Sequence, residues 1–229
     1  MKVLAVASEA MEAMPWVTRC ALRERLDWEL PCAYRTTWNG SQLYVVANGP
    51  GPALASQAVT AAAERVGPFD AFVSFGLCGA LDPALTVGTI CSATEVSDGR
   101  ERWFASPLAE SQTGRLFSTD RFLATPDEKA RRFAENYRIA DMEAAAVARY
   151  ATERGSAFYA AKVVSDTAGE TFKLDFNAYR DADGRFDRRR IARAAALHPF
   201  RYAPDLIRMA KRGTAASATL GEFLANTRF

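Results

Sequence analysis

Histidine is almost absent from this chain, which has His198 alone in 229 residues. The four cysteines, Cys20, Cys32, Cys78 and Cys91, are far apart and form no Cys-x-x-Cys pair. A structural zinc site needs clustered cysteine and histidine ligands, so the sequence predicts no metal centre. Unpaired thiols are typical of a reducing compartment, and we expect a cytoplasmic protein.

Long apolar runs are also missing. The longest, such as Val3–Ala7 and Leu43–Ala47, have the length of a β-strand, whereas crossing a bilayer takes about 20 apolar residues. The first run is too short for the core of a signal peptide, and Ser8 and Glu9 follow it in place of a cleavage site. We therefore expect Val3–Ala7 to be the first strand of a globular domain.

The chain also lacks a strong net charge, since 29 Lys/Arg against 27 Asp/Glu give +2. This balance argues against nucleic acid as a partner. The distribution is less even, because nine Lys/Arg and four Asp/Glu fall between Asp181 and Arg212. No Gly-x-Gly-x-x-Gly opens a helix after the first strand, so NAD, flavin and other cofactors are not expected.

What is present is an alternation of strand and helix patterns. The predicted strands are Val3–Ala7, Arg35–Trp38, Gln42–Ala47, Asp70–Phe75, Thr89–Val96 and Tyr159–Val164. The predicted helices are one carrying Glu12, Met14, Val17 and Leu22, and then Ala53–Val66, Asp127–Glu135, Met142–Arg154, Arg188–Leu197 and Pro204–Leu224. With no internal repeat and no linker, this order predicts a three-layer αβα sandwich in one domain, residues 1–229. A helical tail is expected at about residues 187–229.

Ligands of such folds gather at the carboxyl ends of the strands. Four polar groups fall at such places: Glu9 with Glu12, the glycine segment Gly76–Gly79, Asp141–Glu143, and Ser165 with Asp166. Each also has an ordinary structural explanation. Glu12 can complement a helix dipole, Asp141 can cap a helix, and the glycine segment can form a tight strand-to-helix turn.

The order and spacing of these groups resemble the nucleoside phosphorylase/nucleosidase superfamily. The similarity is to its nucleosidase branch, which includes 5′-methylthioadenosine/S-adenosylhomocysteine nucleosidase and futalosine hydrolase. It runs from Met1 to about Gly169 and rests on Met1–Glu12, Val73–Val96, Ala140–Ala144 and Val163–Ala168. The resemblance implies a mixed central sheet, a purine nucleoside as substrate, no cofactor and a homo-oligomer.

The resemblance also implies roles for single residues. Asp166 would be the general acid that bonds to the imidazole-ring nitrogen of the purine, which requires a raised pKa. Glu143 would accept the two ribose hydroxyls. Glu12 would deprotonate the attacking water, and Glu9, one helical turn earlier, is a second candidate for that base.

The remaining residues of the matched motifs are assigned to the substrate site: Asp141, Ser165, Gly79, Cys78, Leu77, Met142 and Phe122. Met142 would pack on the ribose and Phe122 on the base, although Met142 could be plain core and Phe122 a loop anchor. Leu77 and Cys78 replace small residues of the family pattern and would narrow the pocket. In the nucleosidase pattern a second acidic residue often follows Ser-Asp-x-Ala, and this chain has Gly169 at that position.

Water and phosphate are the two possible nucleophiles. Phosphorylases of the superfamily carry an early Gly-x-Pro-x-Arg loop, whereas residues 7–12 read Ala-Ser-Glu-Ala-Met-Glu here. Two carboxylates repel an anion and suit a water nucleophile, so hydrolysis is favoured. A phosphate-dependent purine nucleoside phosphorylase and a non-catalytic nucleoside-binding protein are the alternatives.

The tail has a resemblance of its own. Asp183-Gly184-Arg185, Arg188–Leu197, His198-Pro199 and Pro204–Arg212 are similar to the ending of hopanoid-biosynthesis-associated nucleosidases, a group linked with release of adenine from adenosylhopane. This implies a lipid-linked adenosine, with methylthioadenosine-like nucleosides or futalosine as rivals. A basic, partly amphipathic tail fits an anionic membrane surface. The alternative is a helix that packs its apolar face on the sheet.

Overall fold

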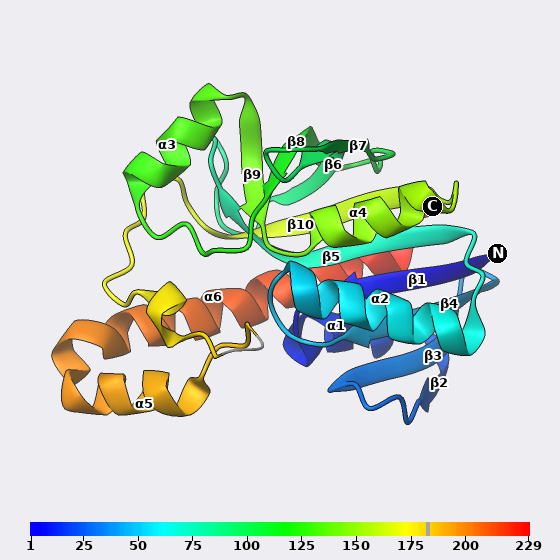
Figure 1. The fold of residues 1–229 in the computed structure, drawn as a ribbon, viewed down its shortest axis with the longest axis horizontal. Helices are drawn as coiled ribbons and strands as arrows, with labels where there is room; N and C mark the ends of the chain where they lie inside the picture. Colours follow the sequence, from blue (N-terminus) through cyan, green and yellow to red (C-terminus); the bar gives the residue numbers. More distant parts are fainter. Residues whose placement is uncertain (182–183) are drawn as a thin grey trace.

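The structure, a computed structural model, describes residues 1–181 and 184–229 (Figure 1). Asp183, the first residue of the tail motif, lies outside the described residues. Within them, no helix combines the length and the apolar character needed to cross a bilayer.

The described strands join into one mixed sheet. They are β1 (Lys2–Ala7), β2 (Ala21–Arg25), β3 (Cys32–Trp38), β4 (Ser41–Ala47), β5 (Ala71–Ala80), β6 (Ile90–Ser97), β7 (Arg102–Phe104), β8 (Gln112–Ser118), β9 (Tyr137–Asp141) and β10 (Ala157–Asp166). Their order is β10-β6-β8-β9-β5-β1-β4-β3-β2, with β7 on β6. Because β10 also pairs with β5, strands β5, β10, β6, β8 and β9 close into a ring. The mixed sheet is confirmed, and its closed half was not foreseen.

Helices cover both faces of this sheet. They are α1 (Ala10–Val17), α2 (Pro52–Val66), α3 (Pro126–Ala134), α4 (Ala144–Glu153), α5 (Arg188–Leu197) and α6 (Pro199–Asn226), with a 3₁₀ turn, η1, at Phe176–Tyr179. Helices α2 and α4 lie on one face, and α1 packs with α6 on the other (Figure 1). The three-layer prediction is therefore confirmed.

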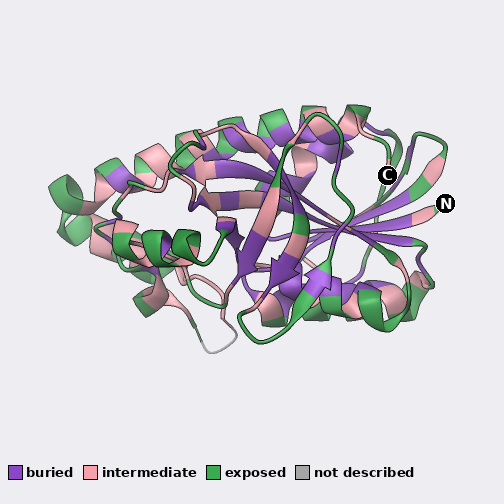
Figure 2. Ribbon diagram, turned by 90° about the horizontal axis from the view of Figure 1, so that it is seen from above, coloured by how far each residue is buried: buried purple, intermediate pink, exposed green. Residues whose placement is uncertain are grey.

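The core follows from the alternation of side chains along the strands. In β1, Leu4 and Val6 join the cluster under α2 and α4, while Val3, Ala5 and Ala7 join the cluster under α1 and α6. Both sets are fully or almost fully buried. Seen from above in Figure 2, the central strands are buried along most of their length, whereas α5 has no buried residue.

The predicted hairpin is present, and its turn has the expected chemistry. Asn39 and Gly40 have φ values of 47° and 75°, as a type I′ turn requires of both central residues. The turn joins β3 to β4 in antiparallel register, with Trp38 opposite Ser41.

Three expectations about element boundaries are wrong. Leu22 does not continue the first helix, because α1 ends at Val17 and Leu22 lies in β2, where it is 81% exposed. The strand expected to end at Phe75 continues to Ala80 and pairs with β10 as far as Gly79, so the alternative of a tight turn at Gly76–Gly79 does not apply. Helix α6 begins at Pro199, five residues earlier than expected, and keeps Pro204 inside its first turns.

Candidate active site

Asp166 ends strand β10 directly opposite Gly79 of β5. A Cβ atom at Gly79 would lie 3.1 Å from Asp166 Oδ2, so the glycine makes room for the carboxyl group. Ser165 Oγ lies 2.8 Å from Asp166 Oδ1 and 3.1 Å from the carbonyl oxygen of Cys78. Burial raises the pKa of Asp166 above its usual value, and the contacts with Lys129 and Ser165 counteract part of the rise.

Lys129 is the direct partner of Asp166. Its side chain comes from α3, is 1% exposed, and places Nζ 2.5 Å from Asp166 Oδ2 and 2.7 Å from the carbonyl oxygen of Thr167. The ring of Phe172 lies 5.8 Å from the same ammonium group. A buried lysine therefore adjoins the predicted general acid.

Glu12 is buried in the first turn of α1. Its Oε2 accepts a hydrogen bond of 3.0 Å from the backbone N–H of Ser8. On its other side lies Gly76, where a Cβ would overlap the same oxygen. Burial, and next the charge of Glu143, raise the pKa of Glu12 to about 8.

Glu143 and Asp141 flank Met142 at the start of α4. Glu143 Oε1 accepts a hydrogen bond of 2.8 Å from the backbone N–H of Gly51, which precedes α2. Burial, and next the charge of Asp141, raise the pKa of Glu143 to about 7. Asp141 Oδ2 accepts from the backbone N–H of Ala144 at 3.0 Å, which is the capping contact considered for it from the sequence.

Lys162 connects these carboxylates. It lies in the middle of β10, fully buried, with Nζ 2.7 Å from Asp141 Oδ2 and 3.0 Å from Ser74 Oγ. Burial opposes its charge, but Asp141 and Glu143 outweigh that effect and hold the pKa of Lys162 above its usual value. The same ammonium group counteracts part of the rise in the pKa of Glu12 and of Glu143. The buried ammonium group of Lys162 thus interacts with the carboxyl groups of Asp141, Glu143 and Glu12.

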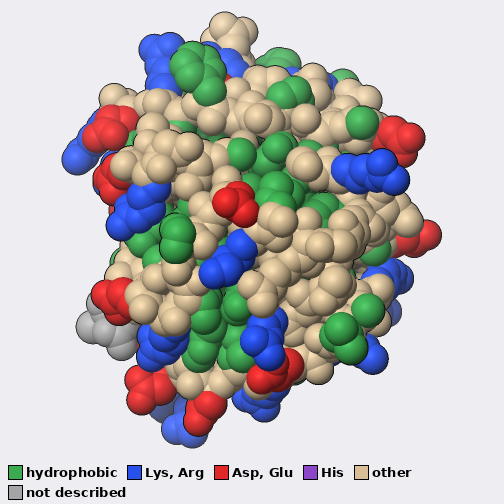
Figure 3. Space-filling view, turned by 90° about the vertical axis from the view of Figure 1, so that its right-hand side faces the viewer, with side chains coloured by type: hydrophobic (Ala, Val, Ile, Leu, Met, Phe, Trp, Pro, Cys, Tyr) green, Lys and Arg blue, Asp and Glu red, His purple; other side chains and the backbone are tan. Residues whose placement is uncertain are grey.

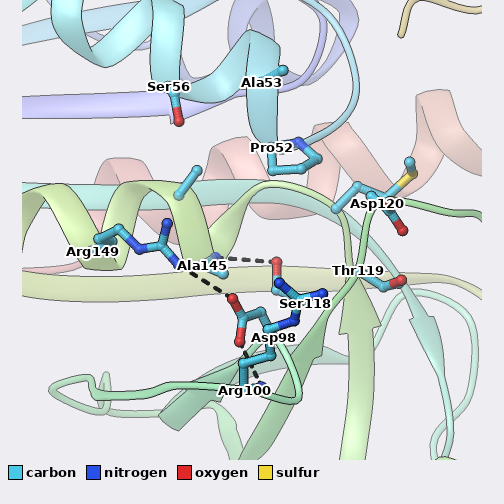
Figure 4. A pocket seen from close by; sticks show the side chains of 12 residues that line it. Pro52, Ala53, Ser56, Asp98, Arg100, Ser118, Thr119, Asp120, Ala145 and Arg149 are labelled. Atoms are coloured by element: carbon cyan, nitrogen blue, oxygen red, sulfur yellow. Dashed lines mark hydrogen bonds and ion pairs between the residues drawn. The ribbon is translucent and has the colours of Figure 1, made fainter.

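A small cavity of about 40 Å³ lies beside Asp166. Its lining includes Gly79, Phe122, Lys129, Asp141, Met142 and Asp166. Met142 also borders a larger groove of about 500 Å³ between the start of α2, α4 and the ends of β6 and β8. Figure 4 shows that groove, with Arg149 paired to Asp98 and Ser118 bonded to the N–H of Ala145. Met142 thus lies between the small cavity at Asp166 and the larger groove, which together could hold a ligand.

Glu9 lies apart from this buried group. Its side chain is about one-third exposed and forms an ion pair with Arg188 of α5. It borders a separate groove with Ser8, Gly49 and Arg185. Of the two glutamates proposed as the base, the structure places Glu12 with Glu143 and Lys162, and Glu9 at the surface.

Leu77 and Cys78, which were expected to narrow the pocket, are not among the residues that line the cavity at Asp166. Alternation along β5 turns them to opposite faces, so that Leu77 packs in the cluster under α1 and α6, and Cys78 in the cluster under α2 and α4. Phe122 does line the cavity. It also packs edge-on against Phe172 and Phe176, with ring centroids 5.0 and 5.4 Å away, so it anchors a loop as well.

Sequence reasoning missed both buried lysines. Lys162 could have been found, because one charged residue inside the otherwise apolar strand Tyr159–Val164 must be buried and needs a partner. Lys129 gave no such signal, since it lies among Asp127, Glu128 and Arg131 in a helix that looks solvated. Across residues 1–181 and 184–229, no group of three or more His, Cys, Asp or Glu side chains is placed to hold a metal ion.

Comparison with known proteins gives the same superfamily as the resemblance of the sequence motifs. The family model described as the Phosphorylase superfamily matches residues 30–111 and 104–198. Among curated proteins, none matches the sequence.

Solved structures share the fold over nearly the whole chain. The 5′-methylthioadenosine/S-adenosylhomocysteine nucleosidase from Neisseria meningitidis, in complex with methylthio-immucillin-A, is 17% identical with a TM-score of 0.74, covering 98% of this chain and 96% of its own. The corresponding enzyme from S. pneumoniae, with a transition-state inhibitor, is 16% identical with a TM-score of 0.74, over 98% and 97%. A futalosine hydrolase mutant from Helicobacter pylori is 13% identical with a TM-score of 0.71, over 98% and 96%.

Proposed function

The chain belongs to the phosphorylase superfamily, and we propose that it is a purine nucleosidase, which hydrolyses the N-glycosidic bond of an adenosine-type nucleoside and releases adenine. One observation carries the proposal: Glu12 is buried, accepts a hydrogen bond from the backbone N–H of Ser8, and lies close enough to Glu143 for the charge of that residue to raise its pKa. With a pKa of about 8, Glu12 is ionised in part of the molecules near neutral pH, and in that form it repels a phosphate dianion and provides a base for water. The nucleosidases with the same fold support this choice.

In this proposal the two ends of the site perform different steps. Cleavage passes through a ribosyl cation-like transition state, in which the departing base needs a proton and the sugar needs a nucleophile. Asp166 delivers the proton to the base, and Glu12 takes one from the attacking water. Glu143 accepts the ribose hydroxyls, and Met142, which lies between the cavity and the groove, packs on the ribose.

Other residues support these steps. Asp141 holds Lys162 and the start of α4, Ser165 orients Asp166, and Gly79 gives the base access to that carboxyl. Phe122 contacts the base from the loop that it anchors. Glu9 is a less suitable base than Glu12, because Arg188 neutralises it at the surface.

The test measures base release from adenosine and methylthioadenosine, each with and without phosphate. The wild type should release adenine without phosphate. Asp166→Asn should lower kcat by about 10²–10⁴-fold while nucleoside still binds. A protein that releases base only with phosphate is a phosphorylase, and a protein that binds nucleoside without releasing base is a binding protein; either result contradicts the proposal.

We also propose a lipid-linked nucleoside of the adenosylhopane type as the substrate, with peripheral membrane contact. Support comes from the basic arm, which we define as residues 188–212, α5 and the first half of α6. It has eight Lys/Arg against one Asp/Glu in a chain of net charge +2. It also exposes Leu197, Phe200 and Ile207 by 67%, 96% and 54%. In Figure 3, the opposite end of the molecule shows charges of both signs interspersed.

Vesicle sedimentation tests the basic arm. The wild type should bind vesicles containing phosphatidylglycerol, bind less as salt increases, and ignore pure phosphatidylcholine. Phe200→Asp should weaken binding. Phe104→Asp is the matched control, because Phe104 is 84% exposed on β7, away from the arm. Equal binding by both variants, or none by the wild type, would contradict membrane contact.

Two further proposals remain: a cytoplasmic location, which the unpaired cysteines suggest, and a homo-oligomeric state, which the resemblance implies. The second is directly measurable. Light scattering during gel filtration should give at least twice the mass of the 25.0 kDa chain. A mass of one chain at micromolar concentration would contradict it.

A further inference from the structure

The ion pair between Lys129 of α3 and Asp166 of β10 is buried, although α3 is a short helix whose other charged residues lie nearer the surface. Helix α3 has all the local stabilisation that it needs at its start, where Thr125 and Glu128 form a reciprocal capping box. Lys129 is nevertheless withdrawn from water and held between Asp166 and the carbonyl oxygen of Thr167. Removing two charges from water is expensive, so a pair at this position calls for an explanation other than helix stability.

The contacts of Asp166 are those of an ionised carboxylate. Oδ2 accepts from the Lys129 ammonium group, and Oδ1 lies within hydrogen-bond distance of the Ser165 hydroxyl. A carboxylate with acceptor contacts on both oxygens has no proton to give. The proposed function nevertheless requires Asp166 to protonate a departing base, so the proton must come from another group at the site.

We propose that Lys129 supplies this proton through Asp166, an inference that rests on the proposed function. As the glycosidic bond breaks, its electron pair goes to the base. Asp166 takes a proton from Lys129 Nζ and passes it to the ring nitrogen of the base, which leaves Lys129 neutral and Asp166 ionised. Water forms the new bond to the sugar and gives its proton to Glu12. Exchange with solvent after release returns a proton to Lys129 and removes one from Glu12.

The groups around the pair are compatible with this transfer. Those that face it are Ser165, Cys78 and Gly79 behind Asp166, Asp141 and Arg121 across the cavity, and Glu170 on the loop after β10. Glu170 is neutralised in turn by Arg208 and Arg212 of α6. Lys129 is thus the one ammonium group in hydrogen-bond contact with Asp166 among the described residues.

Two substitutions separate proton supply from charge. Lys129→Arg keeps a cation and its hydrogen bonds, but a guanidinium group does not give up a proton in a protein. Lys129→Met removes both. We expect each to lower kcat at neutral pH by about 100-fold or more, the usual contribution of a general acid. The pH profiles should differ when each rate is divided by that of the wild type at the same pH: the ratio for the Met variant increases as the pH falls and solvent protonates Asp166, whereas the ratio for the Arg variant does not.

Lys173→Met is the matched control, since Lys173 is an exposed lysine on the nearby loop, and it should have the kcat and pH profile of the wild type. Circular dichroism and thermal unfolding establish that all variants are folded. An Arg variant with wild-type kcat, or a Met variant whose pH profile is unchanged, overturns the inference and leaves the proposed function standing. A wild type that releases no base from any nucleoside overturns both.

Discussion

At the scale of single residues, the sequence pointed to three acids that the structure buries, and it missed two buried lysines beside them. Glu12, Glu143 and Asp166 were identified from motif spacing, and the structure buries all three. Lys129 and Lys162, which pair with Asp166 and Asp141, were not. Spacing along the chain reports which residues reach the same sheet edge. It does not show which long side chain from another element, such as Lys129 of α3, is buried against those residues.

Gly76 gives a prediction at this scale. It has a φ of +135°, and a Cβ there would overlap Glu12 Oε2. Gly76→Ala should therefore lower both kcat and stability, the latter by about 1–3 kcal/mol for the strained backbone. Gly88→Ala is the control, because Gly88 has a φ of +89° with no neighbour within 4 Å of the added Cβ. It should lose stability but keep kcat, and equal kcat in both variants would show that Gly76 does not position Glu12.

At the scale of elements, apolar patterning predicted the strands that contain apolar runs and missed β2, β7, β8 and the mostly buried β9. Strands β1, β4, β5 and β10 contain apolar runs that the sequence displays. Every residue of β2 is exposed, and β8 begins with exposed polar residues. These strands are specified by backbone pairing with β3 and with β6 and β9, which leaves no mark in side-chain hydropathy.

The packing of α6 on α1 gives the prediction for this scale. A Cβ at Gly221 would come within 2.6 Å of the backbone and side chain of Pro15, whereas one at Gly213 would meet only the mobile ends of Leu77 and Met11, at 3.3 and 3.4 Å. Gly221→Ala should destabilise the protein by about 1–3 kcal/mol through overpacking. Gly213→Ala should be nearly neutral, because a gain of about 1 kcal/mol in helix propensity offsets the tighter contacts. Urea unfolding measures both, and equal stability of the two variants would contradict the close crossing of α1 and α6.

At the scale of the whole molecule, the buried acids make stability depend on pH. Glu12 and Glu143 have pKa values raised to about 8 and about 7, from 4.5. Between pH 4.5 and pH 8, Glu12 and Glu143 keep protons in the folded protein that they have lost in the unfolded chain. Stability should therefore fall as the pH rises from about 4.5 to about 8. Glu12→Gln should flatten the upper part of this dependence. Urea midpoints across the range check the slope, and a stability that increases through pH 7–8 in the wild type would contradict the buried state of these acids.

The chain is also expected to unfold as one cooperative unit, as its single-domain organisation predicts. The second half of α6 packs on α1 and β10, so the basic arm is continuous with a core layer. Tryptophan fluorescence, to which Trp16 and Trp38 of that layer contribute together with Trp28 and Trp103 of the opposite layer, should report the same transition as far-UV circular dichroism. Two separate transitions would show instead that the helical tail is a unit of its own.

The origin of the new oxygen on the sugar tests the central claim most directly. The protein is incubated with an adenosine-type nucleoside in ¹⁸O-labelled water that also contains unlabelled phosphate, and the sugar product is examined by mass spectrometry. With Glu12 activating water at a carboxylate-lined site, the account predicts a free sugar with one ¹⁸O at its anomeric carbon. A sugar 1-phosphate without the label would contradict it, because phosphate would then be the nucleophile.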